Sequence, residues 1–167
     1  LIFVSHDRYF VEKLATKTEF DATILAYAGL RRLDFEIDKG GILHGDAVPD
    51  GINATIIETS DMLPCVGQGA IGIEIRENDE RLSKLCQRLN HYSTQVCTEA
   101  ERAFLSAMGG GCQSPVAAHA VIHNDIIQMP GMSFGNGNSF SESKVSGNAN
   151  DAKSLGSKLA KQIKSGL

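Results

Sequence analysis

The sequence predicts an α/β chain whose C-terminal part is a helix–three-strand–helix module of the α+β class. Apolar side chains recur every four residues at about 93–108 and again at 151–164, which predicts two helices. Between them, residues 117–123, 126–134 and 140–146 are expected to be strands. Turn residues at Asn124, at Asp125 and at 135–138 separate these strands.

The first third of the chain has less regular patterns. Residues 1–4 are expected to form a strand, followed by a helix from about Asp7. Residues 20–32 are expected to run from the end of a strand into a helix that closes with Arg31 and Arg32. Residues 34–61 are rich in Gly and Asp, so we expect an irregular loop with one short strand at 54–57.

The middle of the chain predicts one extended segment and one helix. Ile71, Ile73 and Ile75 alternate with small or charged residues, which is the period of a strand. Residues 79–89 predict an amphipathic helix, whose apolar face carries Leu82, Leu85, Cys86 and Leu89. Gly109 is expected to end the helix at 93–108, and Asn150 or Asp151 to cap the last helix.

Composition excludes several classes of protein. The formal net charge is −4, which argues against a nucleic acid partner, and no apolar run is long enough to span a membrane. The four cysteines form no CxxC pair and no zinc-binding pattern, and no signal peptide is recognised. We therefore expect free thiols and a cytoplasmic location. His119 and His123 are two ligands at most, so no metal site is predicted.

The stretch GGGCQSP at 109–115 contains the most informative residue, Cys112. Three glycines after a helix allow a bulky group to approach the backbone, and a thiol is a strong nucleophile. The preceding helix presents its C-terminus, so its dipole does not activate the thiol. The alternative is a glycine helix cap followed by an incidental cysteine.

Four stretches in order resemble the porphobilinogen deaminase family, also called hydroxymethylbilane synthase. They are FDATILAYAGLRRL, LPCVGQGAIGIEIRENDER, LNHYS and EAERAFLSAMGGGCQSPVAAHA. The resemblance covers residues 20–167 and is strongest between 63 and 120. It implies a transferase of haem and tetrapyrrole biosynthesis that condenses four porphobilinogen units with release of ammonia.

The resemblance also assigns residues. It implies a dipyrromethane cofactor joined by a thioether to Cys112, with Gly111 beside it. Gln68 lies between two glycines and is expected to donate to the cofactor, although a β-bulge in an interdomain strand is an equal alternative. Arg32, and less securely Arg31, are expected to bind the acetate and propionate groups of the pyrroles. The alternative for both arginines is an exposed position favoured by a helix C-terminus.

The family has three domains, and its general acid is an aspartate of the first. We expect residues 19–62 to be a remnant of domain two, 63–90 an interdomain strand and helix, and 91–167 the cofactor-carrying domain. The chain alone is expected to be an inactive fragment that needs the missing N-terminal domains. Its expected partners are porphobilinogen and the growing polypyrrole, with no nucleic acid and no membrane, and it is expected to be monomeric.

Residues 1–18 are predicted to be a foreign βα segment. They resemble the stretch after Walker B in ATP-binding-cassette ATPases of the F subfamily, where a histidine, here His6, senses the γ-phosphate. No phosphate-binding loop accompanies it, so nucleotide hydrolysis is not predicted. Two alternatives to a deaminase remain at this point: an ATPase fragment and a non-catalytic α+β ligand-binding or interaction module.

Overall fold

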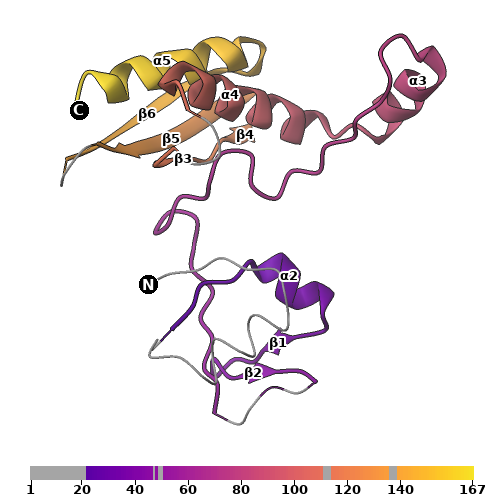
Figure 1. Cartoon of the computed structure of the whole chain (residues 1–167), viewed down its shortest axis with the longest axis vertical. Helices are drawn as coiled ribbons and strands as arrows, with labels where there is room; N and C mark the ends of the chain where they lie inside the picture. Colours follow the sequence, from indigo (N-terminus) through magenta and orange to yellow (C-terminus); the bar gives the residue numbers. More distant parts are fainter. Residues whose placement is uncertain (1–21, 47, 49–50, 111–113, 136–138) are drawn as a thin grey trace. The chain divides into compact units, whose positions relative to one another are not determined.

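The computed structural model describes residues 22–46, 48, 51–110, 114–135 and 139–167 (Figure 1). The chain divides into two compact units, Leu1–Ile57 and Glu58–Leu167. The strand predicted at 1–4 and the helix predicted from Asp7 lie outside the described residues.

The N-terminal unit contains helix α2 (Tyr27–Arg32), which confirms the helix expected there, and two short antiparallel strands, β1 (Glu36–Ile37) and β2 (Leu43–His44). The strand predicted at 54–57 is wrong, because pairing occurs earlier, in β1 and β2 and at a bridge between Ile42 and Asn53. The Asp38 carboxylate accepts the N–H groups of Gly40 and Ile42, which closes the turn between the two strands.

The C-terminal unit begins with a long stretch that pairs in no described sheet. Residues 70–76 form no strand, so the strand predicted from their alternation is wrong, and Ile71 is 93% exposed. A β-strand needs a neighbouring strand for its backbone N–H and C=O groups, and no described residue supplies one. Helix α3 (Glu80–Leu89) follows as predicted, with the Asp79 side chain accepting the N–H of Leu82.

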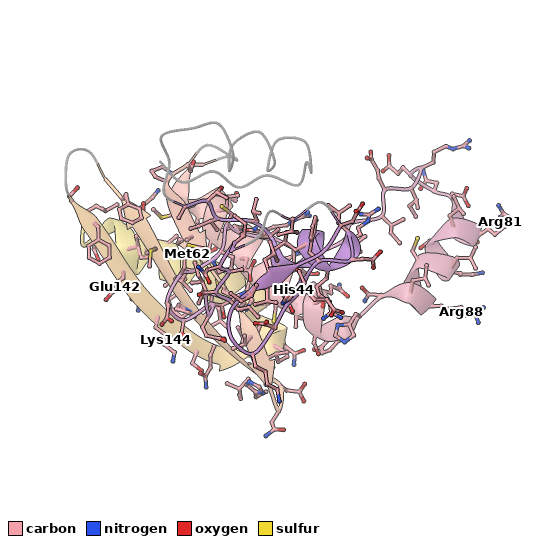
Figure 2. All side chains as sticks on the ribbon, turned by 90° about the horizontal axis from the view of Figure 1, so that it is seen from below. His44, Met62, Arg81, Arg88, Glu142 and Lys144 are labelled. Carbon is pink, nitrogen blue, oxygen red and sulfur yellow. The ribbon has the colours of Figure 1, made fainter. Side chains whose placement is uncertain are left out.

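None of the residues of α3 is buried, despite its apolar face. Leu85 and Leu89 are exposed, and the charged side chains of Arg81 and Arg88 extend into solvent from the same helix (Figure 2). The helix is therefore amphipathic, but its apolar side has no partner among the described residues.

The rest of the C-terminal unit is a four-stranded antiparallel sheet covered on one face by two helices. The strands are β3 (Val116–Ala118), β4 (Val121–His123), β5 (Ile126–Phe134) and β6 (Phe140–Asn148). β5 is central, with β6 on one side and β3 and β4 on the other. Helices α4 (Tyr92–Met108) and α5 (Ala152–Lys164) pack together over the sheet (Figure 1).

The strand predicted at 117–123 is present but interrupted. β3 and β4 pair with β5 in one continuous register, in which His119 and Ala120 stand opposite Pro130 and Met129. The Pro130 carbonyl accepts the His119 N–H at 3.3 Å, but proline has no N–H to return that bond, and the N–H of Ala120 is donated to a side chain of α4. The pairing therefore breaks for two residues.

The core lies between this sheet and the two helices. Its largest fully buried side chains are Phe104, Ile127, Met129, Leu159 and Ile163. On β6 the exposed Glu142 and Lys144 alternate with the buried Ser141 and Val145, so one face of the sheet packs on the helices and the other faces solvent (Figure 2).

The helix and turn signals in this unit are largely confirmed. Gly109 ends α4 in the left-handed conformation, with φ of 81°. Asn124 and Asp125 both have positive φ, as a tight hairpin turn requires. Asp151 stands at the N-cap position of α5, as one of the two predicted caps, but its side chain makes no capping hydrogen bond. A short 3-10 turn (Ala149–Asp151) precedes the helix, and the Asn148 side chain caps that turn.

Candidate functional site

The loop that carries the predicted attachment cysteine starts from a well-defined helix end. Gly109 donates its N–H to the Ser106 carbonyl at 3.0 Å, and Gly110 donates to the Leu105 carbonyl at 3.3 Å. Gly110 also lies directly against the Ser114 side chain, where a β-carbon on residue 110 would overlap the Ser114 hydroxyl. Residues 110 and 114 are therefore close together, and a side chain on residue 110 would force Ser114 to move.

The other end of the loop is fixed to the sheet. The Pro115 carbonyl accepts the N–H of Phe134 at 2.9 Å, and β3 begins with the next residue. Gly111 and Cys112 lie outside the described residues. The structure defines the two elements that flank them, the capped end of helix α4 before the loop and strand β3 after it.

Gln68 occupies a tight turn. Gly67 and Gly69 on either side have φ of 71° and 81°, a backbone region that favours glycine. The Gln68 N–H donates to the Cys65 carbonyl at 3.1 Å, and its side-chain oxygen accepts the N–H of Cys65 at 3.2 Å. The turn belongs to no strand, whereas the β-bulge alternative for Gln68 requires a paired strand. The Gln68 side chain is exposed.

A buried carboxylate connects this turn to the C-terminal sheet. Glu101 on α4 is only 6% exposed. Its Oε2 atom accepts the Gly67 N–H at 2.7 Å, and its Oε1 atom accepts the Ala120 N–H at 2.8 Å. The Ala118 N–H also donates to the Pro64 carbonyl at 3.2 Å. The turn is therefore held against α4 and the β3–β4 edge of the sheet.

Sequence reasoning missed Glu101. A signal was present, because Glu101 follows Cys97 by four residues and precedes Phe104 by three, which places it beside the apolar stripe of α4. A carboxylate in that position is almost never fully buried unless it has partners. The partners here are the backbone N–H groups of Gly67 and Ala120, which cannot be recognised from the pattern of side chains in the sequence.

Two further groups lie close to Glu101. The His119 Nδ1 atom is 3.7 Å from Glu101 Oε1, and the His119 side chain is partly exposed. Burial raises the pKa of the Cys97 thiol, and the negative charge of Glu101 raises it further. Cys97 is therefore a poor nucleophile, in contrast to the exposed Cys65.

The predicted carboxylate-binding arginines belong to the N-terminal unit. Arg31 and Arg32 form the last turn of α2, and both are exposed. Their position at a helix C-terminus is favoured by the helix dipole, as the alternative interpretation stated. Exposed guanidinium groups are also available to bind carboxylates, so this placement is compatible with both roles.

Two negative findings concern the described part of the chain. Within it, no three His, Cys, Asp or Glu side chains gather as a metal site would require. No helix there combines the length and the apolar surface needed to cross a bilayer.

Comparison with protein families shows to which family this chain is related. Residues 95–165 match the model described as porphobilinogen deaminase, C-terminal domain. Residues 9–84 match the model described as porphobilinogen deaminase, dipyromethane cofactor binding domain. The two models together cover most of the chain. The chain belongs to the porphobilinogen deaminase family. The resemblance identified from the glycine-loop and Gln68 stretches is thus confirmed.

Curated porphobilinogen deaminases give the same result. The protein of Chlorobium chlorochromatii is 42% identical over 111 residues, which is 66% of this chain and 31% of that protein. Those of Pelotomaculum thermopropionicum and Nitrobacter winogradskyi are each 35% identical, over 144 and 147 residues, or 86% and 87% of this chain. Each alignment covers 42% of the relative. The chain therefore spans less than half the length of these relatives.

The resemblance of residues 1–18 to an ATP-binding-cassette ATPase is not supported by these comparisons. The deaminase match begins at residue 9, inside the segment expected to be foreign. The resemblance depended on a short apolar run, a histidine and an amphipathic stretch, and many βα units share that pattern.

Proposed function

We propose that this chain is the C-terminal part of a hydroxymethylbilane synthase, a transferase that condenses four porphobilinogen units and releases ammonia. The observation that carries the proposal is the ordered match of two models of one enzyme, at residues 9–84 and 95–165. The C-terminal-domain model, over residues 95–165, contains the position of Cys112. A non-catalytic binding module is the alternative, and it predicts no covalent adduct on the chain. An ATPase fragment has no further support.

Cys112 is the proposed attachment residue of a dipyrromethane cofactor, and the frame of its loop suits that role. A tether needs fixed ends and a side chain free of the core, and the loop is anchored at the Gly109 cap and at the Pro115–Phe134 hydrogen bond. For the thioether bond, the protein needs to contribute only a thiol. When bound, the cofactor supplies the pyrrole terminus on which the chain of pyrroles grows.

The other proposed site residues act by binding. Arg31 and Arg32 would pair with acetate and propionate groups, because guanidinium forms bidentate hydrogen bonds with carboxylates. Gln68, whose side-chain oxygen is used within its own turn, would present its amide N–H groups to the cofactor. Gly111 would allow the cofactor to approach the backbone beside the thioether.

The proposed domain organisation follows the family. Residues 19–62 would belong to the second domain, 63–90 would cross between domains, and 91–167 would form the cofactor-carrying domain. The exposed isoleucines of 70–76 and the unburied α3 support this, since both have apolar surface without a partner in the described residues. Porphobilinogen would be the substrate, and we further propose a monomer acting in the cytoplasm.

The test uses a hybrid enzyme. The aligned 42% of the Pelotomaculum thermopropionicum relative is replaced by this chain, and intact mass and ammonia release are measured. The hybrid is expected to carry a two-pyrrole mass increment and to consume porphobilinogen. Cys112→Ala should remove both, whereas Cys65→Ala, which removes an exposed thiol outside the loop, should retain both. A Cys112→Ala hybrid that keeps its increment, or a parent hybrid without one, would overturn the proposal.

A further inference from the structure

A buried, charged side chain that the proposed chemistry does not use stands out in the C-terminal unit. Glu101 is the only charged residue that is buried among the described residues, and each of its oxygens accepts a backbone N–H. The donors, Gly67 and Ala120, are 34 and 19 residues away in sequence. Such a carboxylate is costly to bury and is retained only where its donors compensate for lost water.

The two hydrogen bonds connect different parts of the unit. Ala120 belongs to the link between β3 and β4, at the point where Pro130 interrupts the ladder. Gly67 belongs to the turn of Gln68, outside the helix–sheet core. Glu101 therefore links the backbone of Gly67 to the core by a hydrogen bond. The side chain of the neighbouring Val66 is partly buried and packs against the same core.

Glu101 stands on the helix that leads to the cysteine loop. It precedes the Gly109 cap by eight residues, which corresponds to about 12 Å along an α-helix. Helix α4 therefore holds the Gly67–Gln68 turn through Glu101 and leads into the cysteine loop at its C-terminal end.

We propose that Glu101 is a positioning residue, which fixes the Gly67–Gln68 turn on α4 and thereby holds Gln68, the proposed cofactor-binding residue, in one orientation. The proposal rests on the proposed function, since it needs a cofactor on the loop. Glu101 itself touches neither substrate nor cofactor in this account. It acts through the backbone of Gly67, and the direction of the Gln68 side chain follows from that of the turn.

The first test measures the hydrogen bonds in the full chain by amide hydrogen exchange. Glu101→Ala should speed exchange of the Gly67 and Ala120 amides by about tenfold or more, since both lose a charged acceptor. Glu101→Gln retains one acceptor oxygen and should give a smaller effect. The Ala149 amide, which donates to the Asp125 carbonyl away from the turn, should stay protected and shows that the unit remains folded. Unchanged exchange at Gly67 in Glu101→Ala would overturn the proposal.

The second test separates positioning from general stability in the hybrid enzyme. Gln68→Ala and Glu101→Gln should each lower the rate of ammonia release, and the double variant should be about as slow as the slower single one. The control Glu99→Gln, on the same helix but partly exposed, should retain the parent rate. Rate losses that multiply, or a Glu101→Gln hybrid as fast as the parent, would refute the positioning role.

The two proposals fail in different ways. A parent hybrid without Cys112-dependent turnover would remove the proposed function, and the positioning role with it. An active parent in which Gln68 and Glu101 act independently would remove only the positioning role. The amide exchange measurement is independent of activity and tests the Glu101–Gly67 hydrogen bond in either case.

Discussion

Gly156 on α5 lies so close to the carbonyl oxygen of Ala100 on α4 that a β-carbon at residue 156 would overlap that oxygen. The same β-carbon would also crowd the backbone nitrogen of Phe104, at 2.7 Å. The two helices that cover the sheet therefore cross at a point where only glycine fits. This contact sets the depth at which α4, with Glu101 and the start of the cysteine loop, sits over the core.

The first prediction follows from this crossing. Gly156→Ala should destabilise the C-terminal unit by about 1–3 kcal/mol, because overpacking forces the helices apart and outweighs the higher helix propensity of alanine. Urea unfolding followed by circular dichroism would measure the change. Ser154→Ala, an exposed position on the same helix, should leave the midpoint nearly unchanged. A Gly156→Ala chain as stable as the parent would contradict the packing at this crossing.

The second prediction concerns the turn between β1 and β2. The hydrogen bond from His44 Nε2, at 2.9 Å, lowers the pKa of the Asp38 carboxyl, and the N–H of Ile42 lowers it further. His44→Ala should therefore raise this pKa toward its ordinary value. A carbon-detected NMR titration of the Asp38 carboxyl would measure it, with His123→Ala on β4 as the control that leaves it unchanged.

The direction of the Asp38 pKa shift determines how the stability of the N-terminal unit changes with pH. Because the pKa of Asp38 is lower in the folded chain than in the unfolded chain, its stabilising effect is present above the ordinary carboxyl pKa of 3.8. It is lost as the pH falls through the lower, folded-state value. The group is exposed, so the effect on the N-terminal unit should be small. A titration in which His44→Ala lowers the Asp38 pKa would contradict the assigned cause.

Most of the C-terminal module could be predicted from the sequence because its signals are local. The four-residue spacing of α4, the glycine after it and the Asn124–Asp125 turn each determine nearby backbone. The strand at 117–123 was predicted without its interruption. That break depends on Pro130 across the sheet and on Glu101 from a helix, both distant in sequence.

The middle of the chain was predicted less well because its pattern lacks a partner. Alternating isoleucines at 71, 73 and 75 predict a strand, but a strand forms only where another strand accepts its hydrogen bonds. The same contrast between local and distant signals holds for the candidate site. Cys112 could be found from glycines and a thiol, whereas Glu101 could not, because its partners are the backbone N–H groups of Gly67 and Ala120.

A third prediction compares two thiols of the C-terminal unit. Burial and the charge of Glu101 keep the pKa of Cys97 above its ordinary value of 9.0, so little thiolate forms at neutral pH. Iodoacetamide at pH 8 should therefore label the exposed Cys65 well before Cys97, as measured by peptide mass spectrometry. In the unfolded chain the two rates should converge. Glu101→Gln should lower the Cys97 pKa and speed its labelling, and a slower reaction would contradict the electrostatic part of the cause.

The fourth prediction concerns the chain by itself. It should release no ammonia from porphobilinogen above the uncatalysed background, because the general acid that the family resemblance implies is an aspartate of the first domain. The chain aligns with only 42% of the Pelotomaculum thermopropionicum relative, so more than half of that protein has no counterpart in the alignment. A thiol can hold a pyrrole chain, but proton transfer to the leaving amine needs a positioned acid.

Ammonia release by the purified 167-residue chain and by the hybrid enzyme, at equal concentrations, would check this prediction. The hybrid should turn over and the chain should not, which would place the missing chemistry in the part supplied by the relative. The chain should nevertheless unfold cooperatively in the same preparation, since its C-terminal core is complete between the sheet and its two helices. Turnover by the chain alone would mean that an acid among its own residues replaces the aspartate of the first domain.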